Sequence, residues 1–336
     1  MKIIVDNKVP YIRETLEKIA DQVIYLPGKD ITHDIVKDAD ALITRTRTKC
    51  NRELLEGSNI KFIGTATIGF DHIDTEFCKK ANITWKNCPG CNAGAVEQYV
   101  HAVLLLLEKE KGINLKNSCI GIIGVGHVGT RIRNMAERLG MKILLNDPPR
   151  NDNGEKGYVD LQTIADNCNI ITFHTPLIRE GKYKTYHLAD KDFFGLLKRK
   201  PVIINTSRGE VIDTNAILDA LNNNTISEAV IDVWENEPNI NIDLLNKVFI
   251  GTPHIAGYSA DGKINATRMT LESLCQFFNI NAEINISLPP DPNAPYSDDE
   301  NTRILQQYNP HDDCEALRSH TQMFEQLRGD YKLRRE

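Results

Sequence analysis

The sequence predicts an α/β protein built from two doubly wound parallel sheets. Short β-type runs alternate with helix-length segments almost from end to end. Because 336 residues exceed what one ordinary core needs, we expect two domains and a smaller appendage. The composition, 41% hydrophobic and 26% charged, is typical of a soluble globular protein, and no apolar run approaches the ~20 residues that span a bilayer. A membrane role is not expected.

Five β-type runs in the first part of the chain predict the first sheet. They are Ile3–Val5, Val23–Leu26, Ala41–Thr44, Lys61–Gly64 and Ile83–Trp85. A long helix is then predicted from about Ala93 to Gly112, because Val96, Val100 and Val103 are spaced three or four residues apart. This helix is expected to lead into a second domain.

Six further β-type runs, separated by helix-length segments, predict the second sheet. They are Cys119–Ile123, Ile143–Asn146, Ile170–Phe173, Val202–Asn205, Ala229–Asp232 and Val248–Gly251. A helix around Ala266–Phe278 follows. The next stretch, SLPPDPNAPYSDDENTR, is rich in proline and acidic residues, so that a linker is predicted there.

The C-terminal residues carry an apolar stripe at helical spacing. Its members are Leu317, Phe324, Leu327 and Tyr331. Such a stripe cannot bury itself alone and needs another surface. That surface is either a second subunit or the rest of the same chain, and the pattern leaves both open.

Charge and cysteine content restrict the partners and the compartment. A net charge of -6 with mixed signs gives no broad basic field, so nucleic acid is not an expected partner. The eight cysteines form no dense disulfide pattern, which favours a reducing compartment. The first residues resemble a strand and a helix rather than an export signal, and a cytoplasmic location is therefore expected.

A glycine-rich loop predicts a dinucleotide site. The motif GVGHVG directly follows the run Cys119–Ile123 and opens a predicted helix, Thr130–Leu139, which completes a βαβ unit with the next strand. Gly124 permits the tight turn, Gly126 lets the backbone approach pyrophosphate, and Gly129 allows close packing of helix and strand. The predicted cofactor residues here are Gly124, Gly126, His127, Val128, Gly129 and Asp147.

Asp147 favours NAD over NADP as the cofactor. It lies 18 residues past Gly129, at the end of the next strand, where a carboxylate accepts hydrogen bonds from ribose hydroxyls and repels a 2′-phosphate. Arg150 is nearby and keeps NADP as the alternative, because an arginine there can accept that phosphate.

Three charged residues that follow predicted strands are candidates for catalysis. Arg208, Glu237 and His254 each come after the carboxyl end of a strand, where ligands bind in open α/β sheets. A histidine can take a hydroxyl proton, a glutamate can orient it, and an arginine can bind a carboxylate with its planar fork. Taken singly, each also fits a satisfied loop residue, a solvated carboxylate or a surface ion pair.

The strand-end motifs resemble those of the D-isomer-specific 2-hydroxyacid dehydrogenases. The resemblance rests on NTSRGEVID, DVWENEP and TPHIAGY, together with GVGHVG and Asp147, and it spans roughly residues 1 to 280. It implies that Arg208, Glu237 and His254 are the catalytic residues, with His254 as the acid/base group. It also implies two domains, a flavodoxin-like substrate domain (1–94 and 258–284) and a Rossmann NAD domain (95–257).

Further motifs resemble one branch of that family. GTATIGFDHID, CPGCNA, NDPPR, FHTPL and HIAGYSADGK resemble the members that oxidise 4-phospho-D-erythronate to 2-oxo-3-hydroxy-4-phosphobutanoate in vitamin B6 synthesis. The resemblance implies cofactor contacts at Thr175, Asp232 and Gly257, and substrate contacts at Thr46, Thr67 and Tyr258. Arg45 and Arg47 are either further cations for the phosphate or exposed loop residues.

The same branch implies a homodimer. Its C-terminal segment forms a dimerisation domain, so residues 285–336 are predicted to be a linker and a short dimerisation segment. FEQLRGDYKLRRE resembles part of it, but the family's segment is usually longer than the one here. Whether the shortened segment supports a dimer is left open.

Two other functions and one motif are weighed against this prediction. The chain could act on another D-2-hydroxy acid, such as phosphoglycerate or glycerate, or be an NAD-sensing binding protein of the same fold. Cys88 and Cys91 have the spacing of a redox pair or half a zinc site, but no second such motif accompanies them, so a turn is predicted and no metal is expected. His72, His101, His174 and His187 are expected to be structural; His174 at most borders the cofactor.

Overall fold

The computed structural model describes residues 1–288 and 297–336, which form two compact units. The first unit contains Met1–Asn92 and residues 259–288. The second contains Ala93–Tyr258 and residues 297–334. The segment 259–288, which lies between the two parts of the second unit in the sequence, therefore belongs to the first unit. No helix in the described part of the chain is long and apolar enough to cross a membrane.

The first unit holds a five-stranded parallel sheet in the order β2-β1-β3-β4-β5. Its strands are β1 (Lys2–Asp6), β2 (Gln22–Leu26), β3 (Ala41–Thr44), β4 (Phe62–Thr65) and β5 (Thr84–Lys86). All five predicted runs are confirmed to within one residue. The two sides of β1 are both buried, with Ile3 and Val5 in one core and Ile4 in the other, as expected for a sheet covered on both faces.

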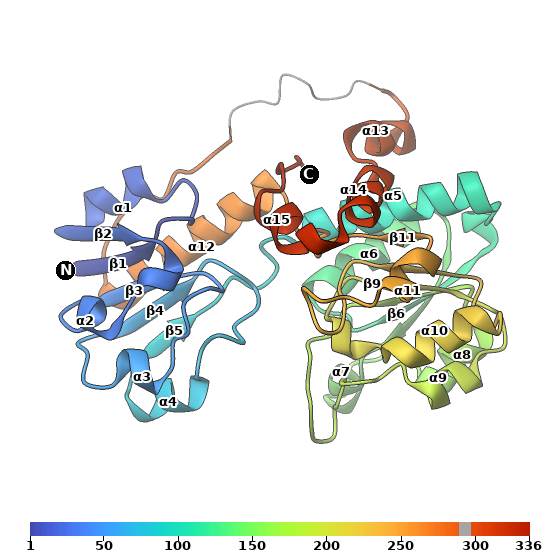
Figure 1. Cartoon of the computed structure of the whole chain (residues 1–336), viewed down its shortest axis with the longest axis horizontal. Coiled ribbons are helices and arrows are strands. Elements are labelled where there is room, and N and C mark those ends of the chain that lie inside the picture. Colours follow the sequence, from blue (N-terminus) through green and yellow to red (C-terminus); the bar gives the residue numbers. More distant parts are fainter. Residues whose placement is uncertain (289–296) are drawn as a thin grey trace. The chain divides into compact units, whose positions relative to one another are not determined.

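Helices cover both faces of this sheet (Figure 1). One face packs against α1 (Arg13–Ile19) and α12 (Ala260–Phe278), and the other against α2 (His33–Val36), α3 (Arg52–Leu55) and α4 (Thr75–Lys80), while η1 spans Gly28–Asp30. α12 begins six residues before the predicted Ala266. The reason is a cap, because the Ser259 hydroxyl accepts the Gly262 N–H at 2.8 Å.

The second unit holds a six-stranded parallel sheet in the order β11-β10-β9-β8-β6-β7. Its strands are β6 (Cys119–Ile123), β7 (Lys142–Asn146), β8 (Ile170–Phe173), β9 (Val202–Asn205), β10 (Glu228–Ile231) and β11 (Ile250–Gly251). These six predicted runs are confirmed to within two residues. β11 is the shortest because Val248 instead ends the helix before it.

Two apolar layers cover the faces of this sheet. One contains α5 (Ala93–Lys111) and α6 (His127–Arg138), and the other contains α8 (Leu161–Asn167), α9 (Lys191–Leu196), α10 (Thr214–Asn222) and α11 (Ile242–Lys247). The shorter elements are α7 (Pro148–Asp152), η2 (Leu115–Asn117) and η3 (Gly209–Val211). The predicted long helix near Ala93 is confirmed as α5. With this sheet, the predicted fold class of two parallel α/β domains is confirmed.

The C-terminal residues pack against the second unit of their own chain. They form α13 (Glu300–Gln307), α14 (Pro310–Ser319), η4 (Thr321–Met323) and α15 (Phe324–Gly329). Leu317 and Phe324 are 0% and 1% exposed within the core of this unit. Of the two surfaces left open by the sequence, these side chains therefore pack on the rest of their own chain. The apolar stripe does not lie on one helix, because η4 separates its members. Dimerisation through this segment stays a prediction.

The predicted linker is only partly correct. Residues 289–296 of it lie outside the described residues. At its end the prediction is wrong, because α13 already begins at Glu300, inside the stretch assigned to the linker. Asp299 starts this helix by accepting the Thr302 N–H at 2.7 Å, a cap that outweighs the polar composition.

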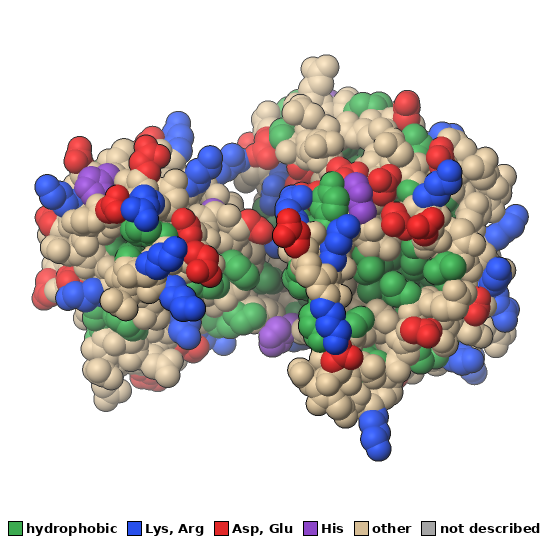
Figure 2. All heavy atoms as spheres, turned by 90° about the horizontal axis from the view of Figure 1, so that it is seen from below, with side chains coloured by type: hydrophobic (Ala, Val, Ile, Leu, Met, Phe, Trp, Pro, Cys, Tyr) green, Lys and Arg blue, Asp and Glu red, His purple; other side chains and the backbone are tan. Residues whose placement is uncertain are grey.

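Charge is mixed on the surface, and the cysteines are buried. On the face shown in Figure 2, Lys and Arg side chains are interspersed with Asp and Glu. All eight cysteines are buried, and none of them is bonded in a disulfide. The Cys88 thiol lies 3.1 Å from the Ala266 carbonyl oxygen, and burial raises its pKa to about 11. In the described ranges, no cluster of His, Cys, Asp and Glu could hold a metal ion.

Candidate active site

The glycine loop after β6 leaves space for a ligand at the start of α6. Gly124 has φ +86°, and a Cβ there would lie 2.7 Å from the His174 carbonyl oxygen. A Cβ on Gly129 would lie 2.1 Å from the Gly124 carbonyl oxygen, so the helix can approach only with glycine at this position. At Gly126, by contrast, an added Cβ would meet no atom within 4 Å. This open, N–H-rich helix start fits the pyrophosphate of a dinucleotide.

Asp147 places a carboxylate beside the same loop. It follows β7, and its Oδ2 accepts the Val125 N–H at 2.8 Å. Its Oδ1 accepts the Arg150 N–H at 3.2 Å, which starts α7. The Arg150 guanidinium is itself engaged, with Nε 3.1 Å from Glu155 and Nη1 2.6 Å from the Val125 carbonyl oxygen. The negative charge therefore lies at the loop, and the nearest arginine already has an acidic partner.

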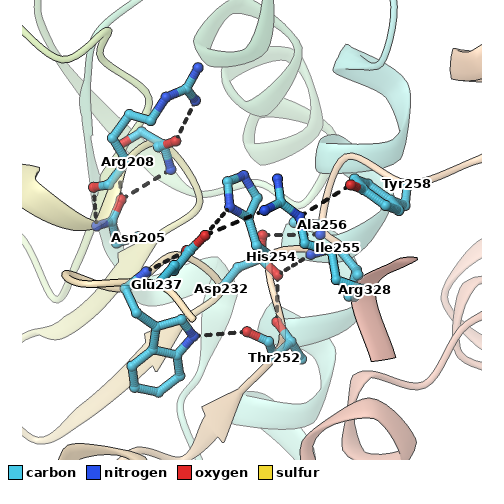
Figure 3. Close-up of polar contacts among 12 residues, drawn as sticks. Asn205, Arg208, Asp232, Glu237, Thr252, His254, Ile255, Ala256, Tyr258 and Arg328 are labelled. Atoms are coloured by element: carbon cyan, nitrogen blue, oxygen red, sulfur yellow. Dashed lines mark hydrogen bonds and ion pairs between the residues drawn. The ribbon is translucent and has the colours of Figure 1, made fainter. Parts of the chain in front are cut away.

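A histidine and a glutamate form a hydrogen-bonded pair after strands β10 and β11 (Figure 3). The His254 Nδ1 lies 2.8 Å from the Glu237 Oε2. The other oxygen, Oε1, accepts the Trp234 N–H at 2.9 Å. Because an ionised carboxylate only accepts, Nδ1 carries the proton, and Nε2 of the neutral ring keeps a lone pair. The pair thus has the composition of a general base with its orienting acid.

Glu237 is held in its charged form. Burial raises the pKa of this carboxyl, but the hydrogen bond and the charge of His254, the Trp234 N–H and the Arg328 guanidinium outweigh the burial and bring the pKa below its ordinary value. Glu237 is therefore ionised at neutral pH, and it stabilises an imidazolium at His254.

The loop that carries His254 is fixed by Asp232. This carboxylate is 1% exposed and accepts hydrogen bonds from the Thr252 hydroxyl at 2.6 Å, the Ile255 N–H at 2.8 Å and the Ala256 N–H at 3.0 Å. Burial raises the pKa of Asp232, an effect that these donors and His254 only partly offset. The side chain thus serves the shape of the loop, and its predicted contact with the cofactor stays a prediction.

Arg208, Glu237 and His254 line one cavity of the second unit. The cavity has a volume of about 370 Å³, and its other lining residues are Arg179, Tyr186, Gly209, Glu210, Trp234, Glu235 and Asn236. The Arg208 Nη1 donates to the Ser207 carbonyl oxygen at 2.8 Å. In Figure 3 its guanidinium lies apart from the His254–Glu237 pair. The structure therefore brings the three predicted residues to one cavity.

The other predicted contacts are distributed over both units. Thr175 follows β8, and its buried hydroxyl has no hydrogen-bond partner in the described part of the chain, which leaves it available to a ligand. The Tyr258 hydroxyl accepts from the Arg328 Nε at 3.2 Å. Thr46 and Thr67 belong to the first unit, after β3 and β4, and the Thr67 hydroxyl donates to the Gly69 carbonyl oxygen at 2.9 Å.

Sequence reasoning did not find Arg328. This residue lies in α15, and its Nη1 is 3.6 Å from the Glu237 Oε2. It belongs to the stretch FEQLRGDYKLRRE, which the resemblance connects only with dimerisation, and its neighbour Leu327 belongs to the predicted apolar stripe. Whether α15 reaches Glu237 depends on how the C-terminal segment folds back, which spacing does not encode.

The chain was compared with known proteins. The NAD-binding domain of the D-isomer-specific 2-hydroxyacid dehydrogenases matches residues 95–256. Erythronate-4-phosphate dehydrogenase from Bacteroides thetaiotaomicron is 60% identical over 100% of this chain and 97% of its own length. Among solved structures, D-lactate dehydrogenase from Aquifex aeolicus, with NAD and lactic acid bound, aligns with a TM-score of 0.69 at 26% identity, covering 83% of this chain and 96% of that one.

A second solved structure supports the same cofactor. The NAD+-bound 3-phosphoglycerate dehydrogenase from Entamoeba histolytica aligns with a TM-score of 0.70 at 28% identity, covering 86% of this chain and 99% of that one. The predicted cofactor, NAD, is confirmed by the matching domain and these neighbours, and the chain is an NAD-dependent dehydrogenase. By its full-length identity to curated relatives, the chain belongs to the erythronate-4-phosphate dehydrogenases, within the D-isomer-specific 2-hydroxyacid dehydrogenase family.

Proposed function

We propose that this protein oxidises 4-phospho-D-erythronate to 2-oxo-3-hydroxy-4-phosphobutanoate, with NAD as the hydride acceptor, in the synthesis of pyridoxal 5′-phosphate. The observation that carries the proposal is the His254–Glu237 pair, which lines one cavity with Arg208 in a chain of this family. A base, its orienting acid and a guanidinium are the groups that oxidation of a 2-hydroxy acid needs.

Each of the three residues has a distinct role. His254 Nε2 takes the proton of the C2 hydroxyl, and bound NAD would supply the acceptor for the C2 hydride. Glu237 stabilises the imidazolium that forms at His254. Arg208 binds the substrate carboxylate and stabilises charge on the developing carbonyl oxygen. The products are the 2-oxo acid, NADH and one proton, which His254 holds.

The cofactor and substrate contacts are proposed on the same basis. The glycine loop with His127 and Val128 holds the pyrophosphate, and Asp147 accepts from the ribose hydroxyls. The remaining proposed contacts are Thr175, Asp232 and Gly257 for NAD, and Thr46, Thr67 and Tyr258 for the substrate. The unpaired, buried hydroxyl of Thr175 supports its assignment.

We also propose a cytosolic homodimer. Eight cysteines without a disulfide fit a reducing compartment. The dimer rests on the family's C-terminal segment, although the segment here packs on its own unit. Light scattering on the purified protein tests it, and a mass near the 37.9 kDa of one chain at micromolar concentration would contradict the dimer.

Steady-state assays of NADH formation test the substrate. We expect kcat/KM for 4-phospho-D-erythronate to exceed that for 3-phosphoglycerate and for D-glycerate by about 100-fold or more, since a site built for a hydroxyl and a phosphate rejects acids that lack either one or place them differently. A preference for 3-phosphoglycerate would overturn the assignment. Tight NAD binding without turnover of any of these acids would favour the NAD-sensing alternative.

A further inference from the structure

The C-terminal segment supplies a cation to the proposed active site of its own chain. Arg328 approaches Glu237 Oε2 with its Nη1 at 3.6 Å, and the same oxygen lies 2.8 Å from the His254 Nδ1. Its Nε donates to the Tyr258 hydroxyl at 3.2 Å. Figure 3 shows the guanidinium lying between Tyr258 and the Glu237–His254 pair. One carboxylate oxygen therefore has two cationic or potentially cationic neighbours.

We propose that Arg328 is a positioning residue for the oxidation, which fixes the Glu237 carboxylate in its ionised form and thereby holds the His254 ring that accepts the proton. This proposal rests on the proposed function, because it assumes that His254 acts as the base. It goes beyond that function by assigning a role to a segment that the family resemblance connects only with dimerisation.

Geometry supports the fixing of Glu237. The carboxylate is held from three sides, by the Trp234 N–H on Oε1 and by His254 and Arg328 on Oε2. The side chains of Glu237 and Arg328 are 17% and 26% exposed, so that solvent screens their interaction less than it screens a surface ion pair. With fewer orientations open to the carboxylate, the His254 ring is held in one orientation as well.

Electrostatics supports the effect on Glu237. Like the hydrogen bond and the charge of His254 and the Trp234 N–H, the Arg328 guanidinium lowers the pKa of the Glu237 carboxyl, so it favours the ionised form that holds the His254 ring. The charged and titratable groups that face the pair are Arg328 from α15, Asp232 and Tyr258 from the flanking loops, and Arg179, Arg208, Glu210 and Glu235 around the cavity. Of these cations, Arg328 lies with its Nη1 3.6 Å from the Glu237 Oε2.

The same segment also anchors the loop after His254. Arg334 is 8% exposed, and its guanidinium donates to the Ile255 carbonyl oxygen at 3.1 Å and to the Ala256 carbonyl oxygen. It also donates to the Gln98 Oε1 at 2.9 Å and to the Ala95 carbonyl oxygen at 3.1 Å, both on α5. Together with the buried ring of Phe324, these contacts hold the segment that presents Arg328.

The test compares two arginines of the C-terminal segment. Arg328→Gln removes the charge near Glu237, and Arg328→Lys keeps it. Arg318→Gln is the matched control, because Arg318 is 28% exposed, lies 3.5 Å from Glu315 and donates to the Val248 carbonyl oxygen, away from the proposed active site. Arg328→Met, which keeps the aliphatic stem, replaces the Gln variant if that variant does not fold.

The measurements are kcat and KM across pH 5 to 9 and the melting temperature, on the 2-hydroxy acid that the wild type oxidises fastest. For Arg328→Gln we expect kcat to fall about tenfold with KM for NAD unchanged, and the acid limb of kcat/KM to move up by about half to one pH unit. Arg328→Lys should keep the acid limb at the wild-type pH. Arg318→Gln should leave kcat and the acid limb unchanged and should lower at most the melting temperature.

Two results would overturn the proposal. One is that Arg328→Gln, or Arg328→Met if that variant is used, has the same kcat and the same pH profile as the wild type. The other is an equal displacement of the acid limb in Arg318→Gln, which would indicate a general structural effect. A wrong substrate assignment is recognised separately, because it changes which acid the wild type prefers and not the comparison between variants.

Discussion

Two histidine–glutamate pairs lie close together in the second unit, and they differ in what surrounds them. His187 Nε2 is 2.7 Å from the Glu235 Oε1, and its Nδ1 is 3.3 Å from the Asp213 Oδ2. The other oxygen of Glu235 accepts the Thr214 N–H at 2.9 Å, at the start of α10. Both ring nitrogens of His187 therefore have acidic partners, and the pair ties its loop to a helix.

In the second pair, only one ring nitrogen of histidine is engaged. His254 Nδ1 meets Glu237, whereas no hydrogen bond to Nε2 is found from residues 1–288 or 297–336. His254 and Glu237 line the same cavity as Arg208. The comparison teaches that a histidine–carboxylate contact does not identify a general base. The available ring nitrogen of His254, in a cavity with a guanidinium, supports the proposal that His254 is the base.

The largest expected difference is in kcat, between variants of the two histidines. His254→Ala should lower kcat by about 10²–10⁴-fold with NAD affinity nearly unchanged, because the proton acceptor is lost while the nucleotide site stays intact. His187→Ala should leave kcat within about threefold and lower the melting temperature. Steady-state assays, NAD titration and thermal unfolding measure the three quantities. Similar residual activity in both variants would remove the distinction between the pairs.

The two glutamates give the next largest difference. Glu237→Gln should lower kcat by about 100-fold, because an amide neither fixes the tautomer nor stabilises the imidazolium of His254. Glu235→Gln should cost stability and little activity, since Glu235 holds His187 and the start of α10. The comparison fails if Glu235→Gln is the slower enzyme while both variants are folded by circular dichroism.

Two arginines that line the cavity, Arg208 and Arg179, are expected to differ in their effect on kcat/KM. Arg208→Lys should lower kcat/KM for the acid by about tenfold, because an ammonium cannot reproduce the planar fork that meets a carboxylate. Arg179 also lines the cavity, but its side chain is 61% exposed and lies 3.1 Å from Glu210, so that Arg179→Lys should change kcat/KM by about twofold at most. Equal losses in the two variants would leave Arg208 without a special role.

The smallest expected effect is a change of stability with pH, and it concerns a third histidine, His174. Both ring nitrogens of His174 contact hydroxyl groups. His174 lies 2.9 Å from the Thr172 hydroxyl and 3.3 Å from the Thr206 hydroxyl, and burial lowers its pKa to about 3. Below pH 6.5, the ordinary pKa of a histidine, the unfolded chain binds a proton on His174 that the folded chain does not bind. Acidification therefore destabilises the fold.

The test for this histidine is thermal unfolding between pH 7 and pH 5. The melting temperature of the wild type relative to His174→Gln should fall by about 2–4 °C over that range, because only the wild type carries this titration. A difference that does not change with pH would contradict the buried, neutral imidazole.

The sequence determined the sheets and the positions of the strand-end loops more fully than the contacts among them. The runs that became β3, β4, β6, β8 and β9 are short and buried on both faces, so that none of them can be exchanged for a helix without exposing apolar side chains. The cap at Ser259 and the helix start at Glu300 were missed, because one hydroxyl or carboxylate decides them locally. The approach of Arg328 to Glu237 was missed because it depends on the path of the whole C-terminal segment.

A double-mutant cycle of His254→Ala and Glu237→Gln tests the central claim most directly. If Glu237 acts only by holding and stabilising His254, the double variant should lose no more of kcat than His254→Ala alone, to within about threefold. If the two losses multiply in the double variant, Glu237 acts independently of His254, and the proposed base with its orienting acid is contradicted.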